Sequence, residues 1–110
     1  MATFHLAVKT GKRGIGLPHF LYVCRLEKYS LKDDLEYLES GNMPTWAVDN
    51  PRQFWAAADN YERDNGRSYR EIEGALPREL TNEQRIELVQ SFRKKWIDTN
   101  YPYTLAIHCP

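Results

Sequence analysis

The chain has 110 residues, of which 42% are hydrophobic and 13% aromatic, and its 15 basic residues balance its 15 acidic residues. This composition predicts a single folded domain over residues 1–110, and it excludes both a disordered chain and a long-range attraction to polyanions. Because the sequence has neither an apolar span of ~20 residues nor an apolar leader, we expect a soluble, cytoplasmic protein with no membrane partner.

Residues 3 to 9 alternate between apolar and other side chains, which predicts a first strand. The glycine-rich stretch from Gly11 to Gly16 then predicts a turn. Three basic residues surround this turn, namely Lys9, Lys12 and Arg13. A neutral protein can still gather basic residues on one side, so this cluster is the candidate contact with nucleic acid.

Apolar residues recur at helical spacing from Phe20 to about Leu38, which predicts one broken helix or two short ones. The stretch from Ser40 to Pro44 then contains glycine, asparagine and proline, and therefore predicts a loop. Asn50 before Pro51 is typical of a helix start. The helix that begins there should end at Asn65–Gly66.

Residues 69 to 76 alternate again, which predicts a strand that carries Glu71 and Glu73 on one face. Exposed strand faces often carry charges, so this pair alone does not indicate catalysis. Thr81 and Gln84 match a capping box, and a single apolar stripe follows them. We therefore expect a helix from this box to about Trp96.

Residues 103 to 108 alternate and predict a last strand that ends at His108. The order of strand, helices, strand, helix and strand predicts an α+β fold, with a small, mostly antiparallel sheet and helices packed on one face. The other face would be open for a site. Glu71, Glu73, His108 and His5 are the residues that can meet on it.

The residue types alone do not select a chemistry. The three histidines show no metal-ligand spacing such as H-x-H. A tyrosine can attack a phosphodiester once its proton is removed. Seven tyrosines are candidates for that role, namely Tyr22, Tyr29, Tyr37, Tyr61, Tyr69, Tyr101 and Tyr103.

Several segments, taken in order, point to one protein family and so to one chemistry. They are Phe4–Gly11 with the turn after it, Ser40–Pro44, Phe54–Trp55 with Tyr61–Arg63 and Asn65–Arg67, Arg70–Glu73 with Ala75–Thr81, and Tyr103–His108. Together they resemble the first part of a MobA/MobL plasmid-mobilisation relaxase. The shared order over nearly the whole chain is more specific than any one of these motifs.

The resemblance implies an enzyme that nicks one strand of plasmid DNA at the transfer origin and stays joined through a tyrosine to the 5′ phosphate. It implies an HUH-type fold, in which three histidines on an antiparallel sheet hold a divalent metal, Mg²⁺ or Mn²⁺. The metal would act as a Lewis acid on the scissile phosphate. Single-stranded origin DNA and accessory mobilisation proteins would be the partners.

Carried onto this sequence, the resemblance assigns His108 to the first of the three metal ligands. Glu71 and Glu73 match an acidic pair that positions the metal ligands or handles the tyrosine proton. The nucleophile should follow the glycine-rich turn, which selects Tyr22 as the catalytic tyrosine and Tyr29 as the alternative.

The family also places an H-x-H pair soon after the first histidine, whereas this sequence ends at Pro110. We therefore expect an incomplete relaxase domain that holds a metal weakly and does not nick DNA alone. The alternatives are a non-catalytic remnant that binds single-stranded DNA, or the product of a decayed gene.

Overall fold

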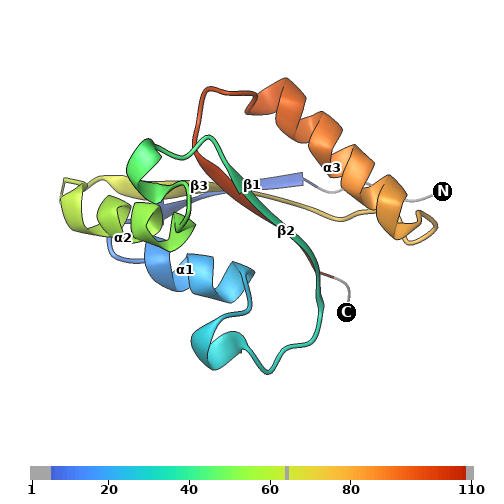
Figure 1. Cartoon of the computed structure of the whole chain (residues 1–110), viewed down its shortest axis with the longest axis horizontal. Helices are drawn as coiled ribbons and strands as arrows, with labels where there is room; N and C mark the ends of the chain where they lie inside the picture. The colour runs from blue at the N-terminus through green and yellow to red at the C-terminus, as the bar shows by residue number, and fades with distance from the viewer. Residues whose placement is uncertain (1–5, 64, 109–110) are drawn as a thin grey trace.

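The computed structural model describes residues 6–63 and 65–108. Its elements are the strands β1 (Leu6–Lys12), β2 (Leu35–Gly41), β3 (Arg67–Gly74) and β4 (Tyr103–His108), the helices α1 (Gly16–Val23), α2 (Pro51–Tyr61) and α3 (Asn82–Trp96), and the short 3-10 helices η1 (Glu27–Tyr29) and η2 (Thr45–Ala47) (Figure 1). The α+β class that the sequence predicts is confirmed. Within the described ranges, no helix has the length and apolar character needed to cross a bilayer.

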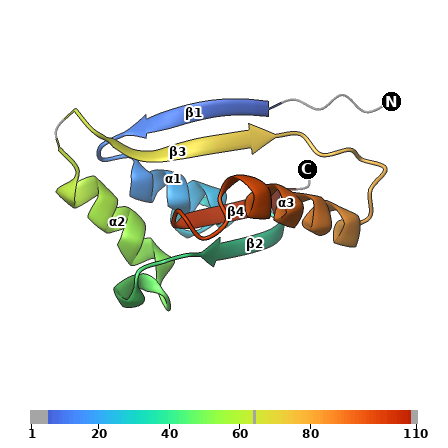
Figure 2. The ribbon, with the colours of Figure 1, turned by 90° about the horizontal axis from the view of Figure 1, so that it is seen from above.

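The strands form two antiparallel pairs rather than one continuous sheet. β1 pairs with β3, and Val8 lies opposite Ile72. β2 pairs with β4, and Ser40 lies opposite Thr104. Figure 2 shows the two pairs side by side, with β3 and β4 as their inner strands. The predicted antiparallel arrangement is therefore confirmed, in the form of two small sheets.

The expected helical region between Phe20 and Leu38 is only partly helical. α1 ends at Val23, and Arg25 follows with φ 55°, a left-handed conformation that cannot continue the helix. Leu35–Gly41 forms β2, so the prediction of helix there was wrong. The leucine spacing fits a helix, but pairing with β4 from the far end of the chain outweighs this local preference.

α2 and α3 begin where the sequence predicts. α2 starts at Pro51 but ends at Tyr61, one turn before the predicted end. α3 starts after a complete capping box: the Gln84 amide donates to Thr81 Oγ1 (3.2 Å), and the Thr81 amide donates to Gln84 Oε1 (2.9 Å). These two bonds satisfy amides that would otherwise lack a partner at the helix start.

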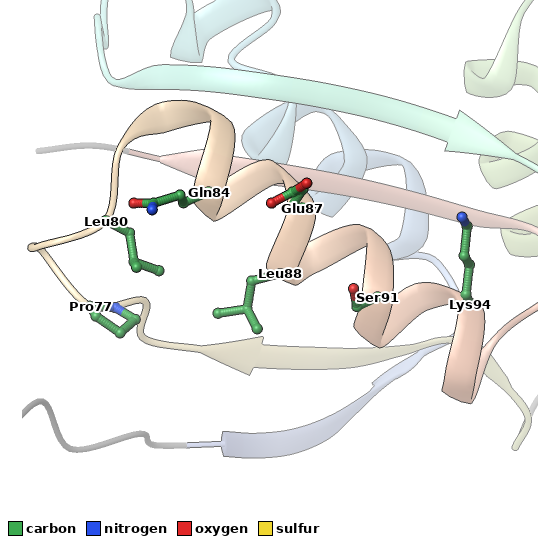
Figure 3. Close-up of a pocket in the computed structure, with 7 residues that line it drawn as sticks. All are labelled: Pro77, Leu80, Gln84, Glu87, Leu88, Ser91 and Lys94. Atoms are coloured by element: carbon green, nitrogen blue, oxygen red, sulfur yellow. The ribbon is translucent and has the colours of Figure 1, made fainter.

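α3 lies on the opposite side of the strands from α1 (Figure 1). Glu39 of β2 joins it to the sheet, because the carboxylate accepts hydrogen bonds from Tyr103 Oη (2.6 Å), Tyr37 Oη (2.8 Å) and Gln90 Nε2 (2.5 Å). Burial raises the pKa of Glu39, but these three donors outweigh it and the pKa is lowered. On the outer side of α3, Figure 3 shows an open pocket between this helix and the loop after β3.

Candidate functional site

The start of α1 is held by a carboxylate from α2. Asp59 accepts hydrogen bonds from the backbone amides of Gly14 (3.0 Å), Gly16 (2.8 Å) and Leu17 (2.8 Å). Burial raises the pKa of Asp59, but the three amides outweigh this effect and lower it. Arg13 adds a hydrogen bond from Nε to the Asp59 carbonyl (2.9 Å). These contacts fix the helix that carries Tyr22 against α2.

The glycines of the turn are required by this arrangement. Gly14 has φ +97°, which residues with a side chain rarely adopt. A Cβ on Gly16 would lie 2.9 Å from Asp59 Oδ1, inside van der Waals contact. The glycine-rich turn that the sequence predicts therefore lets the chain approach the carboxylate closely.

Tyr22 lies in the last turn of α1 with 38% of its surface exposed. Its ring lies near two other rings and one guanidinium group. The His19 ring lies 6.3 Å away between centroids at an angle of 25°, and the Tyr29 ring meets it edge-on at 5.2 Å. The Arg25 guanidinium carbon lies 4.6 Å from the Tyr22 ring centroid. The predicted nucleophile is thus accessible and surrounded by polar and cationic groups.

His19 joins α1 to β3 through a close contact between its Nε2 and a carboxylate oxygen of Glu71. Both side chains are largely buried, with 27% and 20% of their surfaces exposed. The imidazole also stacks on Tyr69, with centroids 4.7 Å apart and rings within 1° of parallel. Burial raises the pKa of Tyr69, and the charge of Glu71 adds to the effect. Glu71 therefore lies on the side of β3 that faces α1, and His19 lies between Glu71 and Tyr22.

Arg25 follows α1 and makes its contacts in the interior. Only 8% of the residue is exposed. It donates to both carboxylate oxygens of Asp34 (2.7 and 3.0 Å), to the Tyr22 carbonyl (2.5 Å) and, from Nη2, to Nδ1 of His108 (3.1 Å). The hydrogen bond from Arg25 lowers the pKa of Asp34 to about 2. This residue joins α1 to β4 and to the segment that precedes β2.

The contacts of His108 define the state of its ring. Arginine has only donors, so Nδ1 of His108 accepts the hydrogen bond from Arg25. The other nitrogen, Nε2, lies 2.8 Å from the Val23 carbonyl, which only accepts, so Nε2 carries the hydrogen. His108 is therefore a neutral Nε2–H imidazole whose lone pair is already in use.

This arrangement does not fit a metal centre. Neither nitrogen of His108 is available as a ligand without loss of a hydrogen bond. Among residues 6–63 and 65–108, no group of three or more His, Cys, Asp or Glu side chains is placed to hold an ion. The donor set of these residues is thus incomplete for a divalent cation.

The other predicted site residues lie apart from Tyr22. Glu73 forms an exposed ion pair with Lys9 (3.5 Å). Arg13 is used in the junction with α2, and Lys12 ends β1 at the surface. Glu71 meets His19 of α1 and His108 meets Arg25 just after α1, so both lie on the side that carries α1 rather than on an open face. His5 lies outside the described residues.

Sequence reasoning did not select His19 or Arg25, which make the connecting contacts. A sequence signal was present for His19, which lies three positions before Tyr22 in the same helix. Residues three apart on a helix lie on one face, so His19 was a recognisable neighbour. Arg25 lies beyond the helix end, and its contact with His108 depends on how β4 folds back.

Comparison with known proteins supports the resemblance. The model of the MobA/MobL family matches residues 23–109. The chain is 54% identical to the 43 kDa relaxation protein of Salmonella typhimurium, over 100% of this chain and 30% of that protein. It is 43% identical to Mobilization protein A of Escherichia coli, over 98% of this chain and 16% of that protein. The chain therefore spans less than a third of the length of these two relatives.

Proposed function

Because this chain belongs to the MobA/MobL family, we propose that it is part of a DNA-nicking domain in which Tyr22 attacks a phosphodiester of one plasmid strand. One observation carries the proposal. Glu71 of β3 and His108 of β4, which the resemblance selects, are each connected to Tyr22 through a neighbour of its ring, Glu71 through His19 and His108 through Arg25.

The proposed reaction is a transesterification. Tyr22 Oη forms a bond to phosphorus, and the bond from phosphorus to the 3′ oxygen breaks. The 5′ phosphate stays on the tyrosine and the other strand end leaves with a 3′ hydroxyl. The tyrosine proton passes to the His19–Glu71 pair, in which the carboxylate orients the imidazole and stabilises its charged form. The same proton then neutralises the departing 3′ oxygen.

We do not assign a step to a metal. A divalent cation such as Mg²⁺ or Mn²⁺ would supply Lewis-acid activation of the phosphate. The hydrogen bonds of both His108 nitrogens support the proposal that this chain alone binds such an ion weakly. The proposed partners are single-stranded origin DNA and accessory mobilisation proteins, in the cytoplasm.

A second proposal follows from the same contacts of His108. Without a complete metal site, this chain on its own would bind single-stranded DNA without cutting it. The two proposals differ in the covalent product, since only the nicking reaction leaves DNA attached to Tyr22.

The test uses a chimera in which this chain replaces the matching segment of the 43 kDa relaxation protein. The chimera and the free chain are each incubated with single-stranded origin DNA and Mg²⁺ or Mn²⁺. Covalent adducts are then separated on a denaturing gel. We expect an adduct with the chimera, no adduct with the free chain, and no adduct with the chimera that carries Tyr22→Phe.

Tyr29→Phe is the matched control, because this change removes the hydroxyl of the neighbouring ring and retains its packing. It should leave the adduct in place. If Tyr29→Phe abolishes the adduct while Tyr22→Phe does not, the nucleophile is Tyr29. A folded chimera that forms no adduct with origin DNA would refute the nicking proposal.

A further inference from the structure

We infer that Lys28, Tyr29 and Lys32, together with the ring of Tyr22, bind the phosphates and bases of a single-stranded DNA. We call these four residues the Tyr29 patch. This inference depends on the proposed function in one respect: the proposed function identifies the bound nucleic acid as DNA. These residues come from the end of α1 and the segment after it, whereas the basic cluster Lys9, Lys12 and Arg13 that the sequence suggests precedes α1.

The Tyr29 patch is built from the end of α1, from η1 and from the turn before β2. Its two rings meet edge-on, with centroids 5.2 Å apart. Lys28 Nζ lies 5.2 Å from the centroid of Tyr29, and Lys32 Nζ lies 5.6 Å from that of Tyr22. Each aromatic ring is therefore paired with one ammonium group.

The charge of the two lysines is not neutralised within the chain. Among the described residues, neither ammonium forms an ion pair with a carboxylate. Two nearby carboxylates are already paired, since Glu27 contacts Arg52 (3.0 Å) and Asp34 contacts Arg25 (2.7 Å). Asp33 is the remaining acid of the turn, so positive charge is in excess here.

Arg25 does not compete with the lysines for a ligand. Its side chain is buried and its donors are used by Asp34, the Tyr22 carbonyl and His108. Lys28 and Lys32 are exposed on long, flexible side chains. A phosphate that approaches Tyr22 would therefore meet these two ammonium groups rather than the guanidinium.

The combination of cations and rings fits a single strand better than a duplex. Ammonium groups bind phosphates of any nucleic acid, but bases stack on aromatic side chains only when they are unpaired. Leu31, which is 95% exposed between the two lysines in sequence, adds an apolar surface for a base. The patch thus has the features of a sequence-tolerant site beside the proposed nucleophile.

In contrast, most of the basic cluster near the glycine turn is occupied. Lys9 is paired with Glu73, and Arg13 donates to the carbonyls of Asp59 and Asn60. Only Lys12 of this cluster has no such contact among the described residues. Substitution of the lysines in the Tyr29 patch should therefore affect DNA binding more than substitution of the lysines in the basic cluster.

The test measures binding of fluorescein-labelled oligo(dT) to this chain by anisotropy over a range of salt concentrations. Wild type is compared with Lys28→Gln/Lys32→Gln and with Lys9→Gln/Lys12→Gln. Each phosphate contact with a single strand contributes about 0.7 to the slope of log K against log salt. We expect the first double variant to lower the slope by about 1.4, and the second to lower it by less than half of that.

Two further arms test the aromatic part of the site. Tyr29→Ala should weaken binding by at least about fivefold, because stacking of one base is lost, whereas Tyr29→Phe should bind like wild type. A duplex of the same length should bind more weakly and should not respond to Tyr29→Ala. Thermal unfolding of each variant provides the control for folding.

The inference is overturned if wild type shows no binding at low salt, or if the Lys28→Gln/Lys32→Gln variant keeps the wild-type slope. It is also overturned if duplex and single strand bind alike. These outcomes are independent of the adduct assay. A protein that forms the Tyr22 adduct but does not depend on these lysines would contradict only this inference. One that binds through them but forms no adduct would contradict only the nicking proposal.

Discussion

Arg25 donates a hydrogen bond to Nδ1 of His108 across a distance of 3.1 Å. This contact joins the second residue after α1 to the last residue of β4. It also fixes the tautomer of the histidine, because a nitrogen that accepts from arginine cannot carry a hydrogen itself. The residue that the family resemblance assigns to a metal is therefore part of a hydrogen-bonded network in this chain.

The first prediction concerns this tautomer and the metal. In ¹⁵N NMR spectra of this chain, His108 should appear as a neutral imidazole with the hydrogen on Nε2. Addition of micromolar Mn²⁺ should leave its signals unbroadened, since a metal would have to displace Arg25 or the Val23 carbonyl. Selective broadening of His108 at such concentrations would contradict the account of an incomplete donor set.

A second prediction concerns the His19–Glu71 pair. In the chimera, His19→Gln and Glu71→Gln should each slow adduct formation by roughly 100-fold or more, because a positioned proton acceptor contributes about that much. The double variant should be little slower than either single variant, since the two act as a unit. Adduct formation is followed by single-turnover kinetics.

The matched comparison for that pair is Glu73→Gln, two positions along the same strand. Glu73 forms an exposed ion pair with Lys9, and such pairs contribute little. We expect the rate to change by less than about fivefold. Equal losses for the two glutamate variants would argue against a specific role of Glu71.

The third prediction concerns the start of α1. Asp59→Ala removes the acceptor for three backbone amides and should lower the free energy of unfolding by about 1–2 kcal/mol. The folded-state pKa of Asp59 lies below the ordinary value of 3.8, so its contribution is present above that pH and is lost as the pH falls through the folded pKa. Urea unfolding at a series of acidic pH values should show that the difference in free energy of unfolding between wild type and Asp59→Ala becomes smaller as the pH falls.

A fourth prediction concerns the junction of β4 with α3. Burial, and then the hydrogen bond to Glu39, raises the pKa of Tyr103 to about 12 from the ordinary 10.0. The stability that the neutral Tyr103 contributes to the fold is fully present below pH 10 and is lost as the pH rises towards 12. Phenolate absorbance should show a tyrosine that titrates near pH 12 and that is missing from the titration of Tyr103→Phe. This variant should also be destabilised by roughly 1 kcal/mol through loss of the hydrogen bond.

Local signals predicted much of the fold. The capping box of Thr81 and Gln84, and the proline at position 51, each involve neighbours in sequence and give helices with the predicted starts. The strand at Leu35–Gly41 was not predicted, because its stabilising partner is β4 at the far end of the chain. Spacing within a segment carries no information on such a distant partner.

In the candidate site, too, contacts between distant parts of the chain were not predicted. The resemblance selected Tyr22, Glu71 and His108, but not the side chains that connect them. His19 meets Glu71, and Arg25 meets His108, only after β3 and β4 have folded back towards α1. Contacts of this kind depend on strand order and register, which the sequence pattern leaves open.

α1 has only eight residues, and its two ends are held by groups from other parts of the chain: Asp59 at the start and the contacts of Arg25 after the end. A helix of this length is not stable by itself in water, so its position is set by these anchors. One inserted residue would rotate everything after it by about 100°. The number of residues between the anchors thus determines which groups face Tyr22, and changes of length here should be far less tolerated than changes of side chain.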